Sequence, residues 1–138
     1  MIPVVDAYNI NEYVNSAIYP RDDVVDVWVS STPKYGDCDD YAMSKRQKLL
    51  DLGYRNEDIR LVVVKYGYGT HLLVSVNTEQ GWYVFDNMPP YFYKFSYGQS
   101  ILIDGHWRQT NDKNGNIVPS PQGWVGYCSL NKSDIDCR

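Results

Sequence analysis

The sequence lacks a run of apolar residues near the roughly 20 needed to cross a bilayer, so a membrane-spanning protein is not expected. It also lacks a basic cluster, since 13 lysines and arginines stand against 17 aspartates and glutamates. Because nucleic-acid phosphates require a basic surface, this balance argues against a nucleic-acid partner. The opening residues, MIPVVDAYNINEY, show no basic start followed by an apolar stretch. No secretory signal is therefore recognised, and a cytoplasmic location is expected.

Cysteine and histidine are scarce, so few residues could serve as a thiol nucleophile or a histidine base. Three cysteines are an odd number and do not indicate a disulfide framework. Cys128 and Cys137 could pair in an exported chain, but without a secretory signal free thiols are expected there. Cys38 remains in either case as a candidate nucleophile. Only His71 and His106 could serve as a histidine base, and His106, beside a tryptophan, is expected to lie in a loop or edge strand without a catalytic part.

The 138 residues, 43% of them hydrophobic, predict a single domain, residues 1–138, around one core. Amphipathic spacing predicts a short helix from Ile10 to Ile18. The main helix is predicted from Asp37 to Leu52, with Asp37 as its N-cap and Gly53 as its C-terminal cap.

Valine-rich and aromatic segments after the main helix predict an antiparallel sheet. Its strands are predicted at Leu61–Tyr66, His71–Val76 and Trp82–Phe85, with weaker candidates at Ile101–Ile103 and Trp107–Gln109. An extended segment is also predicted at 24–31, and a turn at 112–115. Asp112, Asn114 and Asn116 faintly resemble a calcium loop, but without its glycine and closing glutamate a turn is the better interpretation. A helix followed by an antiparallel sheet places the chain in the α+β class.

Cys38 stands at the predicted start of the main helix. The unpaired N–H groups and the positive dipole end of a helix stabilise a thiolate, and the Cys38 N–H could also hold the oxyanion formed when a carbonyl is attacked. Trp28 and Ser31 are candidates for a second oxyanion donor. Asp37, Asp39 and Asp40 act in the opposite direction, because neighbouring negative charges raise a thiol pKa.

The hairpin register relates His71 to Asp86. If Glu79 and Gln80 form a two-residue loop, the numbers of paired residues sum to 159. Leu73 then faces Asp86, and His71 lies diagonally from it at a Cβ separation of about 7–8 Å or less. A His–carboxylate hydrogen bond is within reach at that separation. Such a bond would fix the imidazole as the base for Cys38.

Strand alternation predicts which face carries His71. Leu72, Val74 and Val76 form one face, which is expected to be buried, and His71 lies on the other. The helix carrying Cys38 is predicted to meet the His71 face.

The motif GDCDDYAMSKRQKLLDLG, the histidine at 71 and the segment WYVFDN, which contains Asp86, resemble the bacterial transglutaminase-like cysteine peptidases. The best-known members are periplasmic LapG-type proteases that cleave biofilm adhesins, and the resemblance runs from Trp28 to Met88. It implies a papain-like or transglutaminase-like fold, a thiol hydrolase with a Cys38–His71–Asp86 triad, a protein or peptide substrate, and no required cofactor. The chain is short and lacks an export signal, so specificity for an adhesin is not carried over.

The resemblance also implies a candidate calcium site. LapG-type members bind calcium beside the cysteine, and Asp37 and Asp40 match positions used there. Calcium takes several oxygen ligands, which aspartates and carbonyls supply. The alternative is that these aspartates only cap the helix and favour its first turn.

Other functions fit the same residues. A transglutaminase or a glutamine deamidase would use the same triad, and the sequence does not separate water from an amine as the second nucleophile. A catalytically inert module that binds peptides is another alternative. His71 could be structural, Asp86 could cap the following turn, and Asn87 could orient the histidine instead.

Overall fold

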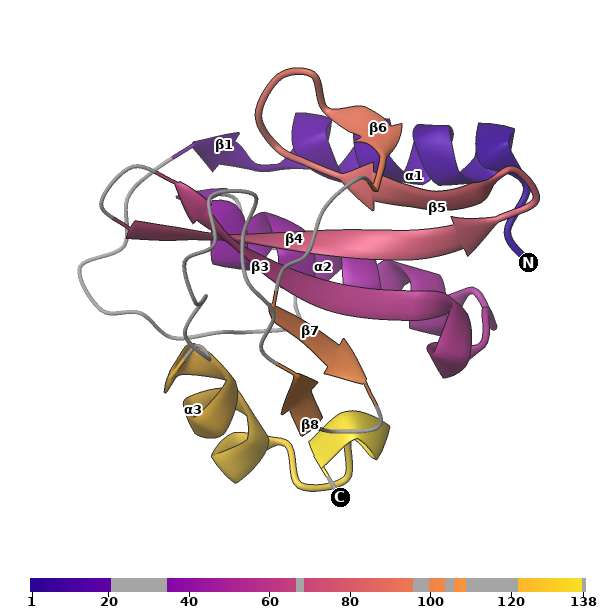
Figure 1. The fold of residues 1–138 in the computed structure, drawn as a ribbon. Coiled ribbons are helices and arrows are strands. Elements are labelled where there is room, and N and C mark those ends of the chain that lie inside the picture. The colour runs from indigo at the N-terminus through magenta and orange to yellow at the C-terminus, as the bar shows by residue number, and fades with distance from the viewer. Residues whose placement is uncertain (21–34, 67–68, 96–99, 104–105, 109–121, 138) are drawn as a thin grey trace.

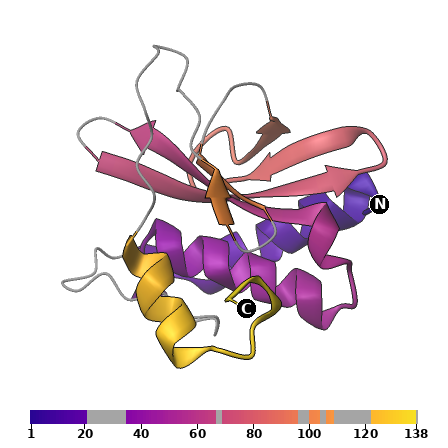
Figure 2. The same cartoon turned by 60° about the horizontal axis from the view of Figure 1, so that its bottom comes forward.

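Two long helices cover one face of an antiparallel sheet in the computed structural model, which describes residues 1–20, 35–66, 69–95, 100–103, 106–108 and 122–137 (Figure 1). The helices are α1 (Val4–Ala17) and α2 (Cys38–Asp51). Figure 2 shows both on the same side of the sheet. Helices and an antiparallel sheet in these layers make an α+β fold, as the sequence predicts.

The large sheet has the strand order β6-β5-β4-β3-β7-β8, and its pairings are antiparallel. Its strands are β3 (Ile59–Tyr66), β4 (Gly69–Thr78), β5 (Gly81–Phe85), β6 (Phe92–Lys94), β7 (Ser100–Ile103) and β8 (His106–Arg108). The other elements are the short parallel pair β1 (Tyr19–Pro20) and β2 (Tyr35–Gly36), the helix α3 (Gln122–Leu130), and two 3-10 turns, η1 (Asn56–Asp58) and η2 (Ile135–Cys137).

The register between β4 and β5 is the predicted one. Val74 pairs with Phe85 and Thr78 pairs with Gly81, so the numbers of paired residues sum to 159. Gly81 has a φ of 103°, a conformation that glycine adopts without strain at the end of this two-residue loop. β5 ends at Phe85, and Asp86 follows it directly.

The main core lies between the helices and the sheet. It joins apolar residues of α1 and α2 to one face of β3, β4 and β5: Ala7, Ile10, Ala42, Met43, Leu49, Leu61, Val63, Leu72, Val74, Val76 and Phe85. The opposite face of the sheet carries a smaller cluster of Val62, Leu73 and Val84. The prediction that the Cys38 helix meets the His71 face is therefore wrong. An apolar helix stripe is buried best against the apolar face, and that is the face of Leu72, Val74 and Val76.

The local predictions agree with the structure where sequence signals are strong. α2 and its N-cap Asp37 match the predicted helix, and Gly53 follows it with a φ of 87°. α1 begins at Val4, six residues earlier than predicted. α3 and β6 are not predicted by the sequence pattern. The predicted extended segment at 24–31 and the turn at 112–115, with the Asp112–Asn116 stretch, lie outside the described residues.

The C-terminal segment is closed by a disulfide. Cys128 on α3 and Cys137 on η2 are bonded, with their Cα atoms 5.3 Å apart. The prediction of free thiols at these positions is wrong, because η2 turns the chain back onto α3. Cys38 is a free cysteine. Among the described residues no helix combines the length and apolar character that crossing a bilayer requires.

Candidate active site

The nucleophile candidate Cys38 is the first residue of α2, and two aspartates cap that helix around it. The Asp39 N–H donates to Asp37 Oδ1 at 3.2 Å, and the Asp37 N–H donates to Asp40 Oδ2 at 3.0 Å. This reciprocal capping box uses backbone donors that the first turn of a helix leaves unpaired. It fixes the backbone on both sides of Cys38.

Gly36 lets this cap close. A Cβ at position 36 would lie 2.5 Å from both Cβ and Oδ2 of Asp40. Asp40 is buried, and its carboxylate belongs to the capping box. The glycine is therefore needed for close approach of the β2 backbone to the start of α2.

The environment of the Cys38 thiol raises its pKa. Burial is the largest cause, and the charges of Asp39 and Asp37 add to it, whereas a hydrogen bond with the Leu72 backbone acts in the opposite direction. The result is a pKa of about 12, and the thiol donates to Asp39 Oδ1 at 3.5 Å. Burial and the neighbouring carboxylates thus raise the pKa of the Cys38 thiol, in the direction opposite to the effect expected of a helix start.

His71 and Asp86 form a buried pair. His71 Nε2 lies 2.8 Å from Asp86 Oδ1, as the hairpin register predicts. Asp86 also accepts hydrogen bonds from the Met88 N–H on Oδ1 at 2.9 Å and from the Tyr93 hydroxyl on Oδ2 at 2.8 Å. Burial raises the pKa of the Asp86 carboxyl, but these hydrogen bonds and the charge of His71 outweigh it, so the pKa lies below its ordinary value.

Two asparagines of α1 hold the turn that contains Asp86. Asn15 Nδ2 donates to the Asp86 carbonyl at 2.9 Å, and Asn11 Nδ2 donates to the Tyr91 carbonyl at 3.0 Å. α1 thus reaches both ends of the segment from Asp86 to Tyr91. These contacts come from elements distant in sequence, and no local motif signals them.

Cys38 lies against β4, the strand that carries His71. Its thiol contacts the backbone of Leu72, the residue after His71 in β4. In the described part of the chain no hydrogen bond joins Cys38 Sγ to the His71 ring. The structure therefore joins His71 to Asp86, and the Cys38 thiol lies against the strand that carries His71.

Lys45 is a buried cation that the sequence analysis does not identify as part of this region. Its side chain is 1% exposed, and its Nζ lies 5.7 Å from the centre of the Tyr41 ring. Burial lowers the pKa of the Lys45 amine to about 7, although the charge of Asp86 acts to raise it. The helix that carries the nucleophile thus also carries a buried amine whose pKa the charge of Asp86 affects.

The calcium candidates fit only part of a metal site. One oxygen each of Asp37 and Asp40 accepts a backbone hydrogen bond in the capping box. Within the ranges that the structure describes, no group of three or more His, Cys, Asp or Glu side chains could hold a metal. Two carboxylates supply fewer than the six to eight oxygens, roughly, that calcium takes. The proposed oxyanion donors Trp28 and Ser31 lie outside the described residues.

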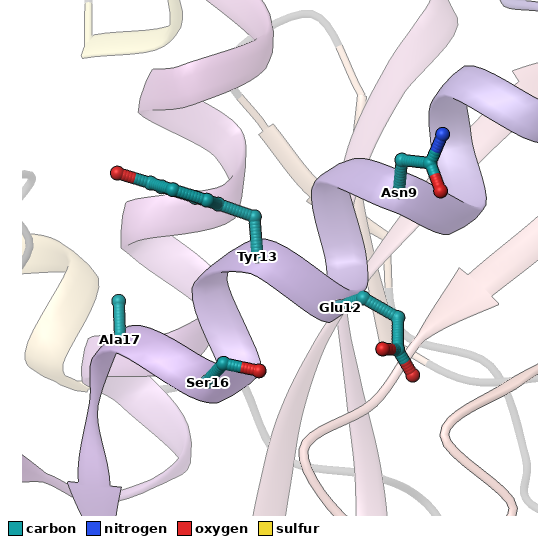
Figure 3. Close-up of a pocket in the computed structure, with 5 residues that line it drawn as sticks. All are labelled: Asn9, Glu12, Tyr13, Ser16 and Ala17. Atoms are coloured by element: carbon teal, nitrogen blue, oxygen red, sulfur yellow. The ribbon is translucent and has the colours of Figure 1, made fainter.

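Two other features lie away from this site. His106 is exposed on β8, which β3 and β7 separate from β4. A hollow of about 450 Å³ lies along α1 (Figure 3), and its lining includes Glu12 and Tyr13 but neither His71 nor Cys38.

Comparisons with known proteins agree on a family and a fold. A model of the bacterial transglutaminase-like cysteine proteinases matches residues 4–114. The calcium-bound LapG of Legionella pneumophila superposes with a TM-score of 0.65 at 18% identity, covering 95% of this chain and 80% of LapG. The EGTA-treated form gives 0.62 at 17% identity, covering 94% and 77%. Among the curated proteins no match is found.

Proposed function

We propose that this chain, which belongs to the bacterial transglutaminase-like cysteine proteinases, cleaves peptide bonds. In this proposal Cys38 is the nucleophile, His71 is the base and Asp86 orients the base. The observation that carries this assignment is the 2.8 Å contact between His71 Nε2 and Asp86 Oδ1. The substrate proposed is a protein or peptide.

The carboxylate decides which imidazole nitrogen is basic. When the His71 Nε2–H donates a hydrogen bond to Asp86, the neutral ring carries its lone pair on Nδ1. Nδ1 is then the atom that takes the thiol proton. Because the pKa of the Cys38 thiol is raised, we propose that this proton leaves during attack on the substrate carbonyl instead of beforehand. The attack forms a bond from sulfur to carbon. The imidazolium then gives the proton to the amine nitrogen as the carbon–nitrogen bond breaks, which leaves a thioester on Cys38.

The start of α2 contributes to the same step. The Cys38 N–H is in the first turn of the helix, where it is available to a negative oxygen above the sulfur. Water then attacks the thioester with His71 again as base, which releases the acid product and restores the thiol.

Calcium enters only as a further part of the proposal. The LapG structures are described as calcium-bound and EGTA-treated, and Asp37 and Asp40 would be the ligands here, together with other oxygens. A cation beside the thiol would offset the charges that raise its pKa. Thermal unfolding with calcium and with EGTA tests this. The midpoint should rise with calcium in the natural protein and not in Asp37→Asn, which keeps an N-cap residue. Equal midpoints in the natural protein would reject the calcium site.

Alkylation of Cys38 by iodoacetamide tests the base. Cys128 and Cys137 are bonded to each other, so labelling of the non-reduced protein reports on Cys38. Since a general base contributes on the order of 10²-fold or more, His71→Ala should abolish cleavage of fluorescein-labelled casein and slow alkylation at pH 7 at least several-fold. His106→Ala is the matched control and should change neither.

Two results would contradict the roles proposed for His71 and Cys38. If His71→Ala and His106→Ala are alkylated at the same rate and both cleave casein like the natural protein, His71 is not the base. If Cys38→Ala still cleaves casein, Cys38 is not the nucleophile.

A further inference from the structure

Asp86 divides its two oxygens between different donors. Oδ1 faces His71 Nε2 at 2.8 Å and the Met88 N–H at 2.9 Å, while Oδ2 accepts from the Tyr93 hydroxyl at 2.8 Å. A Tyr hydroxyl on a carboxylate is a charge-assisted hydrogen bond, stronger than a neutral one. Both oxygens of the acid are therefore held by hydrogen bonds.

The hydrogen bond from Tyr93 to Oδ2 restricts rotation of the Asp86 carboxylate. The terminal torsion of an aspartate is broad and roughly two-fold, so hydrogen bonds to Oδ1 alone restrict rotation of the carboxylate less than hydrogen bonds to both oxygens. A donor on Oδ2, fixed independently of the His71 ring, restricts that rotation. It keeps Oδ1 in line with Nε2.

Tyr93 is itself fixed by the sheet. It lies on β6, where it pairs with Val84 of β5, and its ring packs against the cluster of Val62, Leu73 and Val84. The neighbouring Phe92 stacks on Tyr83 with ring centres 4.7 Å apart, which secures β6 at the edge of the sheet. The hydroxyl therefore approaches Asp86 from a framework that does not depend on the turn between them.

We propose that Tyr93 is a positioning residue, whose hydroxyl locks the carboxylate of Asp86 so that Oδ1 stays aimed at His71. This inference rests on the proposed function, because it assigns Tyr93 a part in the triad of that function. The hydroxyl also stabilises the carboxylate charge and contributes to the lowered pKa of Asp86.

Tyr93→Phe removes the hydroxyl and keeps the ring, so the packing on β5 is retained. Tyr83→Phe is the matched control, because Tyr83 lies on β5, next to β6, and the tyrosine hydroxyl that donates to Asp86 is that of Tyr93. Two readouts are measured on each: the proton NMR signal of the His71 Nε2–H together with the titration of the Asp86 carboxyl, and kcat and KM for labelled casein.

In Tyr93→Phe the pKa of Asp86 should rise, the Nε2–H signal should shift and broaden, and kcat should fall about 10-fold with KM nearly unchanged. Tyr83→Phe should leave all of these as in the natural protein. Replacing Tyr93 with 3,5-difluorotyrosine, a more acidic donor, should lower the pKa of Asp86 below its natural value, so the test does not depend on loss of a group.

The inference is overturned if Tyr93→Phe and Tyr83→Phe give the same Nε2–H signal and the same Asp86 titration. One further result would separate the role of Tyr93 from the proposed function. If the NMR readouts change as expected but His71→Ala still cleaves casein, Tyr93 orients the His71–Asp86 pair while the proposed triad fails.

Discussion

Asp134 binds the guanidinium of Arg46 with both carboxylate oxygens, through hydrogen bonds of 2.9 and 2.8 Å. Arg46 is on α2, the helix that begins with Cys38, and Asp134 lies between α3 and η2. Asp136 adds a second carboxylate at 2.8 Å. The C-terminal segment is thus joined to the helix of the nucleophile by a buried ion pair that uses the planar fork of arginine.

Asp134→Ala should destabilise the protein by about 3–5 kcal/mol, because it leaves a buried guanidinium with one of its two carboxylates removed. Urea denaturation measures the change in the free energy of unfolding. Arg55→Ala is the control, since Arg55 also contacts two acids but its side chain is 64% exposed. It should shift the midpoint little. Equal shifts in the two variants would contradict a stabilising buried pair.

The same carboxylate predicts a pH dependence. Burial raises the pKa of Asp134, but the hydrogen bonds from Arg46 and Tyr127 outweigh it, so the pKa lies below its ordinary value. A lowered carboxyl pKa contributes stability above the unfolded value of about 3.9, and this is lost as the pH falls through the folded value. The stability difference between the natural protein and Asp134→Asn should therefore shrink from pH 7 to pH 3. A constant difference would contradict the ion pair.

Gly36→Ala should cost about 1–3 kcal/mol, because its Cβ would overlap Asp40 in the capping box. Thermal unfolding measures the loss, and the alkylation rate of Cys38 should change as the start of α2 shifts. Gly126→Ala is the control: apart from its own helix, no atom of the described residues lies within 4 Å of a Cβ there, and alanine favours its helix by roughly 0.5–1 kcal/mol. Destabilisation by both substitutions would point to a general effect and not to the cap.

Lys45→Met should stabilise the protein, and more so at pH 6 than at pH 9.5. Burial lowers the pKa of Lys45 to about 7, so between that value and the unfolded one, about 10.4, the unfolded chain binds more protons and stability rises with pH. The penalty is complete below pH 7, where an apolar replacement gains on the order of 1–4 kcal/mol. Unfolding midpoints at both pH values check this. Lys48→Met is the control, and an equal gain at both pH values would contradict the prediction.

Reduction of the Cys128–Cys137 disulfide should lower the unfolding free energy by about 2–3 kcal/mol, the value expected for a loop of this length. It should also weaken the hold on Arg46, because Asp134 and Asp136 lie inside the loop. Unfolding with and without dithiothreitol measures the loss, with Cys38→Ala as the background. In that background, a loss unchanged by Asp134→Ala would show that the loop and the ion pair are independent.

The sequence predicts the parts of this site that depend on local signals. An aspartate before an apolar stripe marks the start of α2, and a two-residue loop between alternating strands sets the register that joins His71 to Asp86. The contacts of Tyr93 and Asn15 depend on β6 and α1 lying beside the turn, which is a consequence of tertiary packing. The sheet face met by α2 is mispredicted because both faces of β4 carry buried apolar residues, Leu72, Val74 and Val76 on one and Leu73 on the other, and the helix packs on the more apolar of the two.

The Cys128–Cys137 disulfide and the pKa of the Cys38 thiol could not be predicted from the sequence for another reason. Pairing of Cys128 with Cys137 depends on η2, which no periodic pattern signals. The thiol pKa depends on the balance between a helix dipole and burial beside Asp39. Sequence gives the direction of each effect, and only the packed structure shows that burial is the larger.

Asn11 and Asn15 connect the N-terminal helix α1 to the turn that begins at Asp86. A protease that removed Asn11 and Asn15 would leave Cys38, His71 and Asp86 intact, yet it would take away one hydrogen bond from each end of the turn that presents the carboxylate. Loss of activity by trimming at the N-terminus would then reflect misalignment of the carboxylate and not the removal of a triad residue.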